Sequence, residues 1–227
     1  MASCDWRRGG RIIRSAPWPP LLGSAGAAAV LLFVAVLAHR TGLTALTALL
    51  GLAACGATAA HSLDEESTQV ADASPTSRRR RAAWRLPVVG VPMAVALCGL
   101  FTLDRLDPDT HWLRLLPLAA GAIGIGVGLA AVLRHSGTAA PGELAGVVTL
   151  VGTVLVVAVD PLRRWIELLP LGDAAHPGRS VTLWIAVVGA CAVVTLACTR
   201  DPGAPRRIGW VWPCPCPGVR GVGQLGL

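Results

Sequence analysis

The sequence predicts an all-α membrane protein, a bundle of about six transmembrane helices with both termini in the cytoplasm. Three observations predict it. Only 15% of the 227 residues are charged and 53% are hydrophobic, whereas a soluble domain usually carries about 25% charged residues. The apolar residues gather in six runs, each close to the length that crosses a ~30 Å hydrocarbon core. Most of the arginines fall in alternate connections between these runs, as they do in membrane proteins.

Residues 1–20 form a basic N-terminal segment with several glycines and prolines, so we expect a short interfacial segment rather than a long helix. The first two predicted spans, 21–38 and 43–60, are joined by four residues and should form a helical hairpin. We interpret the first as a retained anchor. Its apolar run is longer than the ~7–15 residues of a cleaved signal peptide, and more spans follow.

The connection 61–85 is the longest strongly polar interruption in the chain, acidic first and then basic. Its sequence Ser-Leu-Asp-Glu, beginning at Ser62, fits a capping box and predicts a short amphipathic helix. A second, arginine-rich helix should begin at Ser74-Pro75 and run into the third span. The alternative is a solvated loop whose arginines hold the topology and bind anionic lipid. The candidate partner-docking residues are Leu63, Asp64, Glu65, Glu66 and Val70.

The remaining predicted spans are residues 86–103, 115–133, 144–159 and 181–198, and the fifth is marginal in length by itself. Within the fourth span, Gly124 and Gly128 form a GxxxG pair. Such a pair allows two membrane helices to approach closely. A nucleotide-binding loop would need these glycines at a strand-to-helix turn, so we interpret them as helix-packing residues.

Residues 160–171 predict an interfacial helix on the outer side, between the fifth and sixth spans. Asp160-Pro161 suits a helix start and Pro170 a helix end. The apolar residues recur at i, i+3, i+4 and i+7, which places them on one helix face: Leu162, Trp165, Ile166 and Leu169. Such a helix could dip into the interface or simply cover the bundle. The tail, residues 199–227, is rich in Pro, Gly and Arg, and we expect it to be disordered.

No catalytic, cofactor or metal site is predicted. The chain has no Lys, hence no P-loop lysine for ATP hydrolysis, and the predicted span interiors hold no ionisable side chain except Cys. Cys214-Pro215-Cys216 could bind a soft metal but lacks an obvious third ligand. The net charge of +7 lies between apolar runs, which favours a role in topology over nucleic-acid binding. With the N-terminus inside, 14 arginines fall on the cytoplasmic side and 6 outside.

This layout, together with the stretch DASPTSRRRRAAWRLP that leads into the third span, resembles the membrane subunit of type-2, exporter-like ATP-binding-cassette (ABC) transporters. The resemblance covers residues 6–200. It implies a homo- or heterodimeric permease in a bacterial cell membrane, exporting a solute with a separate ATPase subunit. It also implies that segment 61–85 carries a coupling helix that docks on the ATPase, and that residues 160–171 are re-entrant or interfacial. The alternative is a non-transporting membrane scaffold or an accessory or regulatory subunit, which suits the lack of polar clusters inside the spans.

Overall fold

The structure, a computed structural model, describes residues 18–38, 43–63, 78–138, 140–158 and 177–199, and within these ranges it contains helices and turns but no strand. The α-helices are α2 (Trp18–Leu37), α3 (Thr44–Ala60), α5 (Arg78–Leu106), α6 (Leu116–His135), α7 (Pro141–Ala158) and α9 (Pro177–Cys198). Three short 3₁₀ helices join or extend them: η1 (His61–Leu63), η2 (Pro108–Thr110) and η3 (Trp112–Leu115).

Each of the six apolar runs coincides with one of these α-helices. Four helical stretches are long and apolar enough to cross a membrane: Trp18–Leu37, Pro87–Leu106, Trp112–His135 and Arg179–Cys198. The apolar helices Thr44–Ala60 and Pro141–Leu155 are shorter. The all-helical fold is therefore confirmed, and four helices of this kind indicate a membrane location.

Several helix boundaries differ from the sequence prediction; α7 begins at Pro141 rather than at residue 144, and α9 at Pro177 rather than at residue 181. α2 begins at Trp18, so Pro19 and Pro20, which we had assigned to the N-terminal segment, lie in its first turn. Proline is tolerated there because the first amides of a helix have no intrahelical acceptor. α5 begins at Arg78 and continues through Pro87 and Pro92. The arginine-rich helix predicted to run into the third span is therefore present from Arg78, and its predicted start at Ser74-Pro75 lies outside the described residues. The arginine run is thus the first turn of the third apolar helix.

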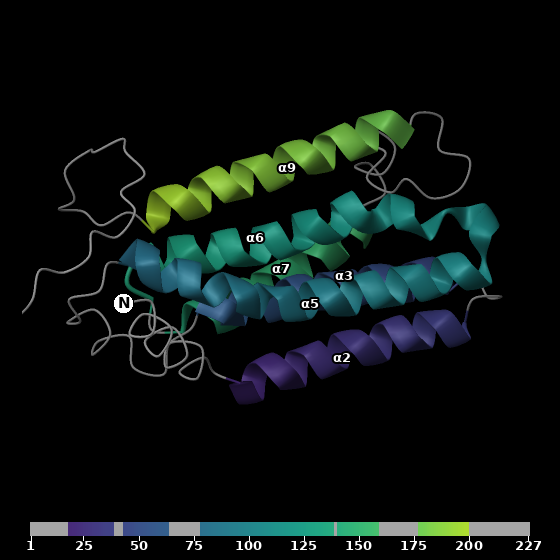
Figure 1. Ribbon diagram of the computed structural model, residues 1–227, viewed down its shortest axis with the longest axis horizontal. Helices are drawn as coiled ribbons and strands as arrows, with labels where there is room; N and C mark the ends of the chain where they lie inside the picture. The colour runs from purple at the N-terminus through teal and green to yellow at the C-terminus, as the bar shows by residue number, and fades with distance from the viewer. Residues whose placement is uncertain (1–17, 39–42, 64–77, 139, 159–176, 200–227) are drawn as a thin grey trace, which may run out of the picture.

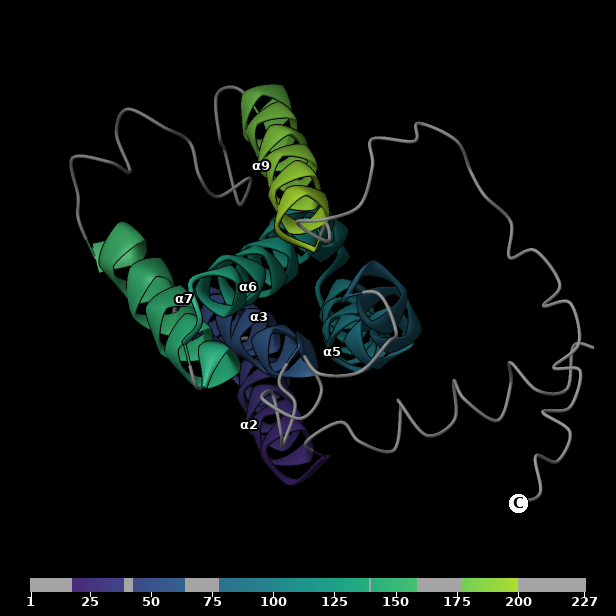
Figure 2. The ribbon, with the colours of Figure 1, turned by 90° about the vertical axis from the view of Figure 1, so that its left-hand side faces the viewer.

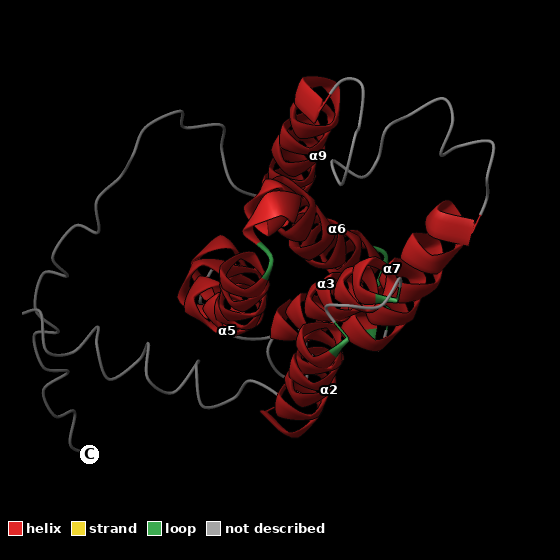
Figure 3. Cartoon of the chain, turned by 90° about the vertical axis from the view of Figure 1, so that its right-hand side faces the viewer, coloured by secondary structure: helices red, strands yellow, loops and turns green. Residues whose placement is uncertain are grey.

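The helices alternate in direction along one axis (Figure 1). α2, α5 and α7 run one way, and α3, α6 and α9 run back. Seen along this axis, α9, α6, α3 and α2 form a stack, with α5 and α7 on opposite sides of it (Figure 2). Figure 3 shows the other end of the bundle, where the chain passes from α5 through η2 and η3 into α6.

α3 lies at the centre of the bundle. It packs against α2, α5, α6 and α7, and 13 of its 17 residues are buried. The residues are mostly Ala, Gly and Thr, which lets four neighbours approach closely. The turn from α2 into α3 is closed by the Thr44 hydroxyl, which donates a hydrogen bond of 2.5 Å to the Ala38 carbonyl.

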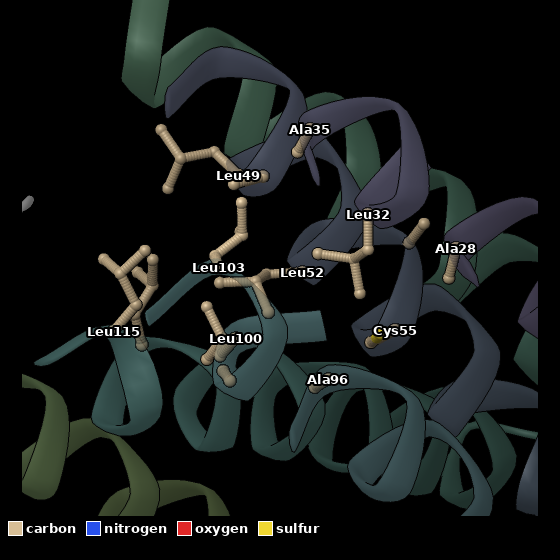
Figure 4. Close-up of a cluster of buried hydrophobic side chains, with 14 of the residues drawn as sticks. Ala28, Leu32, Ala35, Leu49, Leu52, Cys55, Ala96, Leu100, Leu103 and Leu115 are labelled. Carbon is tan, nitrogen blue, oxygen red and sulfur yellow. The ribbon is translucent and has the colours of Figure 1, made fainter. Parts of the chain in front are cut away.

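The main apolar core joins α2, α3, α5, η3 and the first half of α6, and Figure 4 shows part of it. Leu32 of α2 belongs to this core and is 2% exposed. A Cβ atom on Gly51 of α3 would lie 2.7 Å from Leu32 Cγ, and one on Gly99 of α5 would lie 2.8 Å from Leu32 Cδ1. The Leu32 side chain therefore fills a space that exists because both facing residues are glycines.

The outward faces of the helices are apolar. Phe33 of α2 is 60% exposed, Val147 of α7 is 61% exposed and Val193 of α9 is 66% exposed, and other large apolar side chains around the bundle are exposed as well. Soluble proteins rarely present so much apolar surface. The same surface is favourable in hydrocarbon, which supports the membrane location.

Candidate functional site at the basic end of the bundle

The two ends of the bundle differ in charge. We call one of them the basic end, formed by η1, residues 78–85 of α5, the last turn of α6 and the first turn of α7. Among the described residues it carries six arginines (Arg78 to Arg81, Arg85 and Arg134) and a single acidic residue, Glu143. At the opposite end the described charges balance, with Asp104, Asp107 and Asp109 against Arg105, Arg114 and Arg179.

η1 lies in the middle of the basic end. It continues directly from α3 and packs against α2, α5, α6 and α7. One turn before it, the buried Thr58 hydroxyl donates to the Ala54 carbonyl at 2.8 Å. η1, from which the chain continues into the connection 64–77, therefore contacts most of the helices of the bundle.

The capping box predicted at Ser62 is not formed. Ser62 lies inside η1 and is fully buried, and its Oγ atom has no hydrogen-bond partner in the described part of the chain. The pattern did not anticipate that η1 continues from α3: α3 ends at Ala60, and the 3₁₀ turn His61–Leu63 carries Ser62 into the packed end of the bundle.

Arg85 is the residue of the basic end that the sequence interpretation missed. We had placed it in the polar connection 61–85, as part of an arginine-rich helix or of a solvated loop, yet it is 1% exposed. The signal was present in the spacing, because the buried residues of α5 recur every three or four positions: Arg85, Val88, Pro92, Ala96, Leu100 and Leu103. Extending the apolar face of the third helix back by one turn from Val88 reaches Arg85.

Beneath the basic end, α3 and α6 touch through their backbones. A Cβ atom on Gly126 would overlap the carbonyl oxygen of Gly56, and one on Gly56 would lie 2.5 Å from the carbonyl oxygen of Ala122. Thr149 of α7 closes this contact from the side, with its Cγ2 atom 3.1 Å from a Cβ placed on Gly56. α3, α6 and α7 are therefore in close contact at the centre of the described bundle.

α9 is held to the bundle mainly through α6. Gly121 receives the Trp184 ring so closely that a Cβ on Gly121 would overlap it. Gly124 and Gly128 both face Cys191 of α9, with distances of 3.4 Å and 3.7 Å from the added Cβ atoms to Cys191 Cβ. The predicted GxxxG residues lie at a helix contact, but Gly121 and Gly126 make closer approaches than either of them.

Most of the other candidate residues lie outside the described part of the chain. These are the docking residues Asp64, Glu65, Glu66 and Val70, the interfacial-helix residues Leu162, Trp165, Ile166 and Leu169, and the tail motif Cys214-Pro215-Cys216. Leu63 is the last residue of η1. Within the described ranges, no three His, Cys, Asp or Glu side chains are grouped to hold a metal ion.

Comparison of the sequence with models of known protein families and with curated proteins finds no match. No solved structure matches the chain either. The functional argument therefore depends on the charge and packing of the basic end alone.

Proposed function

We propose that the protein is a six-span permease subunit of an ATP-driven export system in a cell membrane, with both termini in the cytoplasm and a separate ATPase bound at the basic end. In this proposal α3 and α7 cross the membrane together with the four longer helices. α3 spans roughly 25 Å at ~1.5 Å per residue, somewhat less than the ~30 Å core. Its burial among four neighbours and its extension by η1 make the shortfall tolerable.

The distribution of charge supports the orientation. The segments that begin or end at the basic end contain 14 arginines and 7 acidic residues, whereas those at the opposite end contain 6 of each. The whole net charge of +7 therefore belongs to one side. Positively charged connections are retained in the cytoplasm, so the basic end should face inward.

The observation that carries the docking proposal is the position of η1. The segment 64–77 joins η1 to the start of α5, and η1 packs against α2, α6 and α7 as well. A partner that moved this segment would act on the centre of the bundle rather than on an isolated loop. The residues proposed to contact the ATPase are Leu63 and Val70, with Asp64, Glu65 and Glu66 offering charge to a basic rim.

The packing also bears on the route of the substrate. α3 and α6 are in backbone contact at Gly56 and Gly126, and the main core cluster consists of apolar residues. A polar solute would have to break this packing to pass through one copy of the chain. We therefore propose that the route lies between two copies, which agrees with a dimeric permease.

The second candidate is a non-transporting scaffold or accessory subunit of a membrane complex. The closed apolar core favours it as directly as it favours a dimeric permease, because a scaffold needs no internal route. The two candidates differ in the partner that the basic end binds.

The test is to purify the full chain from its native membranes after crosslinking from position 63 or 70, and to measure the ATPase activity that is recovered with it. The permease proposal expects an ATP-hydrolysing partner, lost from Leu63→Asp and Val70→Asp. The matched control is Leu113→Asp, a change at an exposed leucine of the opposite end, which should retain the partner.

Recovery of another integral membrane protein and no ATPase would favour the scaffold. Loss of the ATPase from Leu113→Asp as well would show that the docking assignment is wrong.

A further inference from the structure

We propose that Asp64 is the counter-charge of Arg85, and that this ion pair fixes the start of the connection 64–77 to α5. The inference concerns a contact within one copy of the chain, so it needs neither an ATPase partner nor a second copy. It removes Asp64 from the docking residues of the proposed function and leaves Glu65 and Glu66 among them.

The first observation is that Arg85 is a buried charge. Its side chain is 1% exposed, and the residue is not without an interaction partner. A guanidinium group stays charged at any physiological pH. Burying it is unfavourable unless an acidic group or several hydrogen-bond acceptors compensate the charge. A position of this kind therefore calls for a nearby anion.

The described part of the basic end offers Glu143 as its single acidic residue. Glu143 is exposed and lies in the first turn of α7. α7 and α5 are on opposite sides of the helix stack (Figure 2). The counter-charge of Arg85 should therefore come from a segment that leaves the basic end next to α5.

The packing of Leu32 gives the register between α3 and α5. Cβ atoms on Gly51 of α3 and Gly99 of α5 would lie 2.7 Å and 2.8 Å from atoms of this one side chain. The two glycines are therefore at about the same level along the bundle. Because α3 and α5 run in opposite directions (Figure 1), equal distances from this level toward the basic end reach neighbouring points on the two helices.

Arg85 precedes Gly99 by 14 residues, which is about 21 Å at ~1.5 Å per residue. On the other side, the chain runs from Gly51 to the end of α3 at Ala60 and then through η1 to Leu63. At ~1.5 Å and ~2.0 Å per residue this covers about 19–20 Å. Leu63 thus reaches almost the level of Arg85, and Asp64 is the next residue.

Arg85 is also on the appropriate face of α5. It continues the line of buried residues that includes Ala96 and Leu100. These two belong to the core cluster that contains Leu52 and Cys55 of α3. Since η1 itself packs against α5, the chain leaves η1 beside the helix that carries Arg85.

The pair has a consequence for the connection 64–77. Its start would be held to α5 as well as to α3, from which η1 continues. A partner that moved the connection would then act on both helices together. Glu65 and Glu66 follow the fixed point and would remain available to such a partner.

The test compares three single neutralisations in the full chain, purified in a neutral detergent: Asp64→Asn, Glu65→Gln and Glu66→Gln. Thermal unfolding is measured for each. Asp64→Asn should lower the midpoint by at least about 5 °C, because it leaves a buried charge uncompensated. Glu65→Gln and Glu66→Gln are the matched controls and should change it by less than about 2 °C.

Rescue is the second measurement, because it separates loss of the pair from loss of any other contact of Asp64. Adding Arg85→Gln to Asp64→Asn removes the uncompensated charge, so the double variant should unfold at a higher temperature than Asp64→Asn. If Asp64→Asn does not fold, recovery of folded protein from the double variant is the same rescue. Arg85→Gln combined with Glu65→Gln should show none.

Three results overturn the pair. The first is an unchanged midpoint for Asp64→Asn. The second is an equal or larger loss from Glu65→Gln or Glu66→Gln. The third is a double variant of Asp64 and Arg85 that is no more stable than Asp64→Asn.

Discussion

Gly126 of α6 lies directly against the backbone of Gly56 in α3, so closely that a methyl group on Gly126 would overlap the Gly56 carbonyl oxygen. No side chain separates the two helices at this point. Because the blocking atom belongs to the backbone, it cannot move aside by a change of rotamer. The contact sets the separation of the two central helices of the bundle.

Gly126→Ala is therefore expected to destabilise the protein by roughly 2–3 kcal/mol, the upper part of the range for overpacked cores. The free energy of unfolding can be measured by titrating the protein from mixed micelles into SDS. Gly152→Ala is the matched control, since nothing lies within 4 Å of its added Cβ. That change should be neutral or slightly stabilising, because alanine is the better helix former.

Gly121→Ala should behave differently, because the atoms that block it belong to the Trp184 ring and not to the backbone. Each of Gly121→Ala and Trp184→Ala should destabilise the protein alone. The double variant should be more stable than the sum of the two predicts, by about 1–2 kcal/mol. Strict additivity of the two changes would contradict the contact between α6 and α9.

Leu100→Ala should lower the free energy of unfolding by about 2–4 kcal/mol, because Leu100 is fully buried in the main core and its truncation leaves a cavity. Leu97 lies on the same helix and is 43% exposed. In a membrane, lipid replaces the contacts that an exposed leucine loses, so Leu97→Ala should cost under about 1 kcal/mol. If Leu97→Ala and Leu100→Ala lowered the free energy of unfolding equally in a bilayer-mimicking micelle, the buried face of α5 would be assigned wrongly.

The crossing of the two shorter helices can be tested with single cysteines in a background where all seven native cysteines are changed to Ser or Ala. A membrane-impermeant maleimide should label Thr41→Cys in intact cells, and Ser67→Cys only after permeabilisation. These positions lie on either side of α3 in the chain. Labelling of both from outside would show that α3 does not cross.

The same experiment applies to α7, with Thr138→Cys before it and Gly172→Cys after it. We expect Gly172→Cys to react in intact cells and Thr138→Cys to be protected. The reverse pattern at both pairs would keep six spans and invert the orientation. Equal reactivity of Thr138→Cys and Gly172→Cys would remove α7 from the set of spans.

The helices were predictable because an apolar run long enough to cross a membrane can satisfy its backbone only as a helix. Each predicted run therefore coincides with a helix even where its ends differ. The environment of single polar residues was less predictable. Arg85 was placed in the polar connection because it follows an arginine run, and Ser62 looked like a helix cap because of its local sequence. Both assignments used neighbours in the chain, whereas burial depends on neighbours in space.

By itself, then, the sequence determined an all-helical chain with a strong difference in charge between alternate connections, since hydropathy and charge are properties of each segment alone. Only the tertiary structure decided that α3 is central, that Gly56 meets Gly126, and that Arg85 lies on a buried face. Many pairs of Ala- and Gly-rich helices could pack equally well in pairwise terms. Which pairs form depends on how the surfaces of all the helices fit together, and this cannot be derived from the sequence of any one segment.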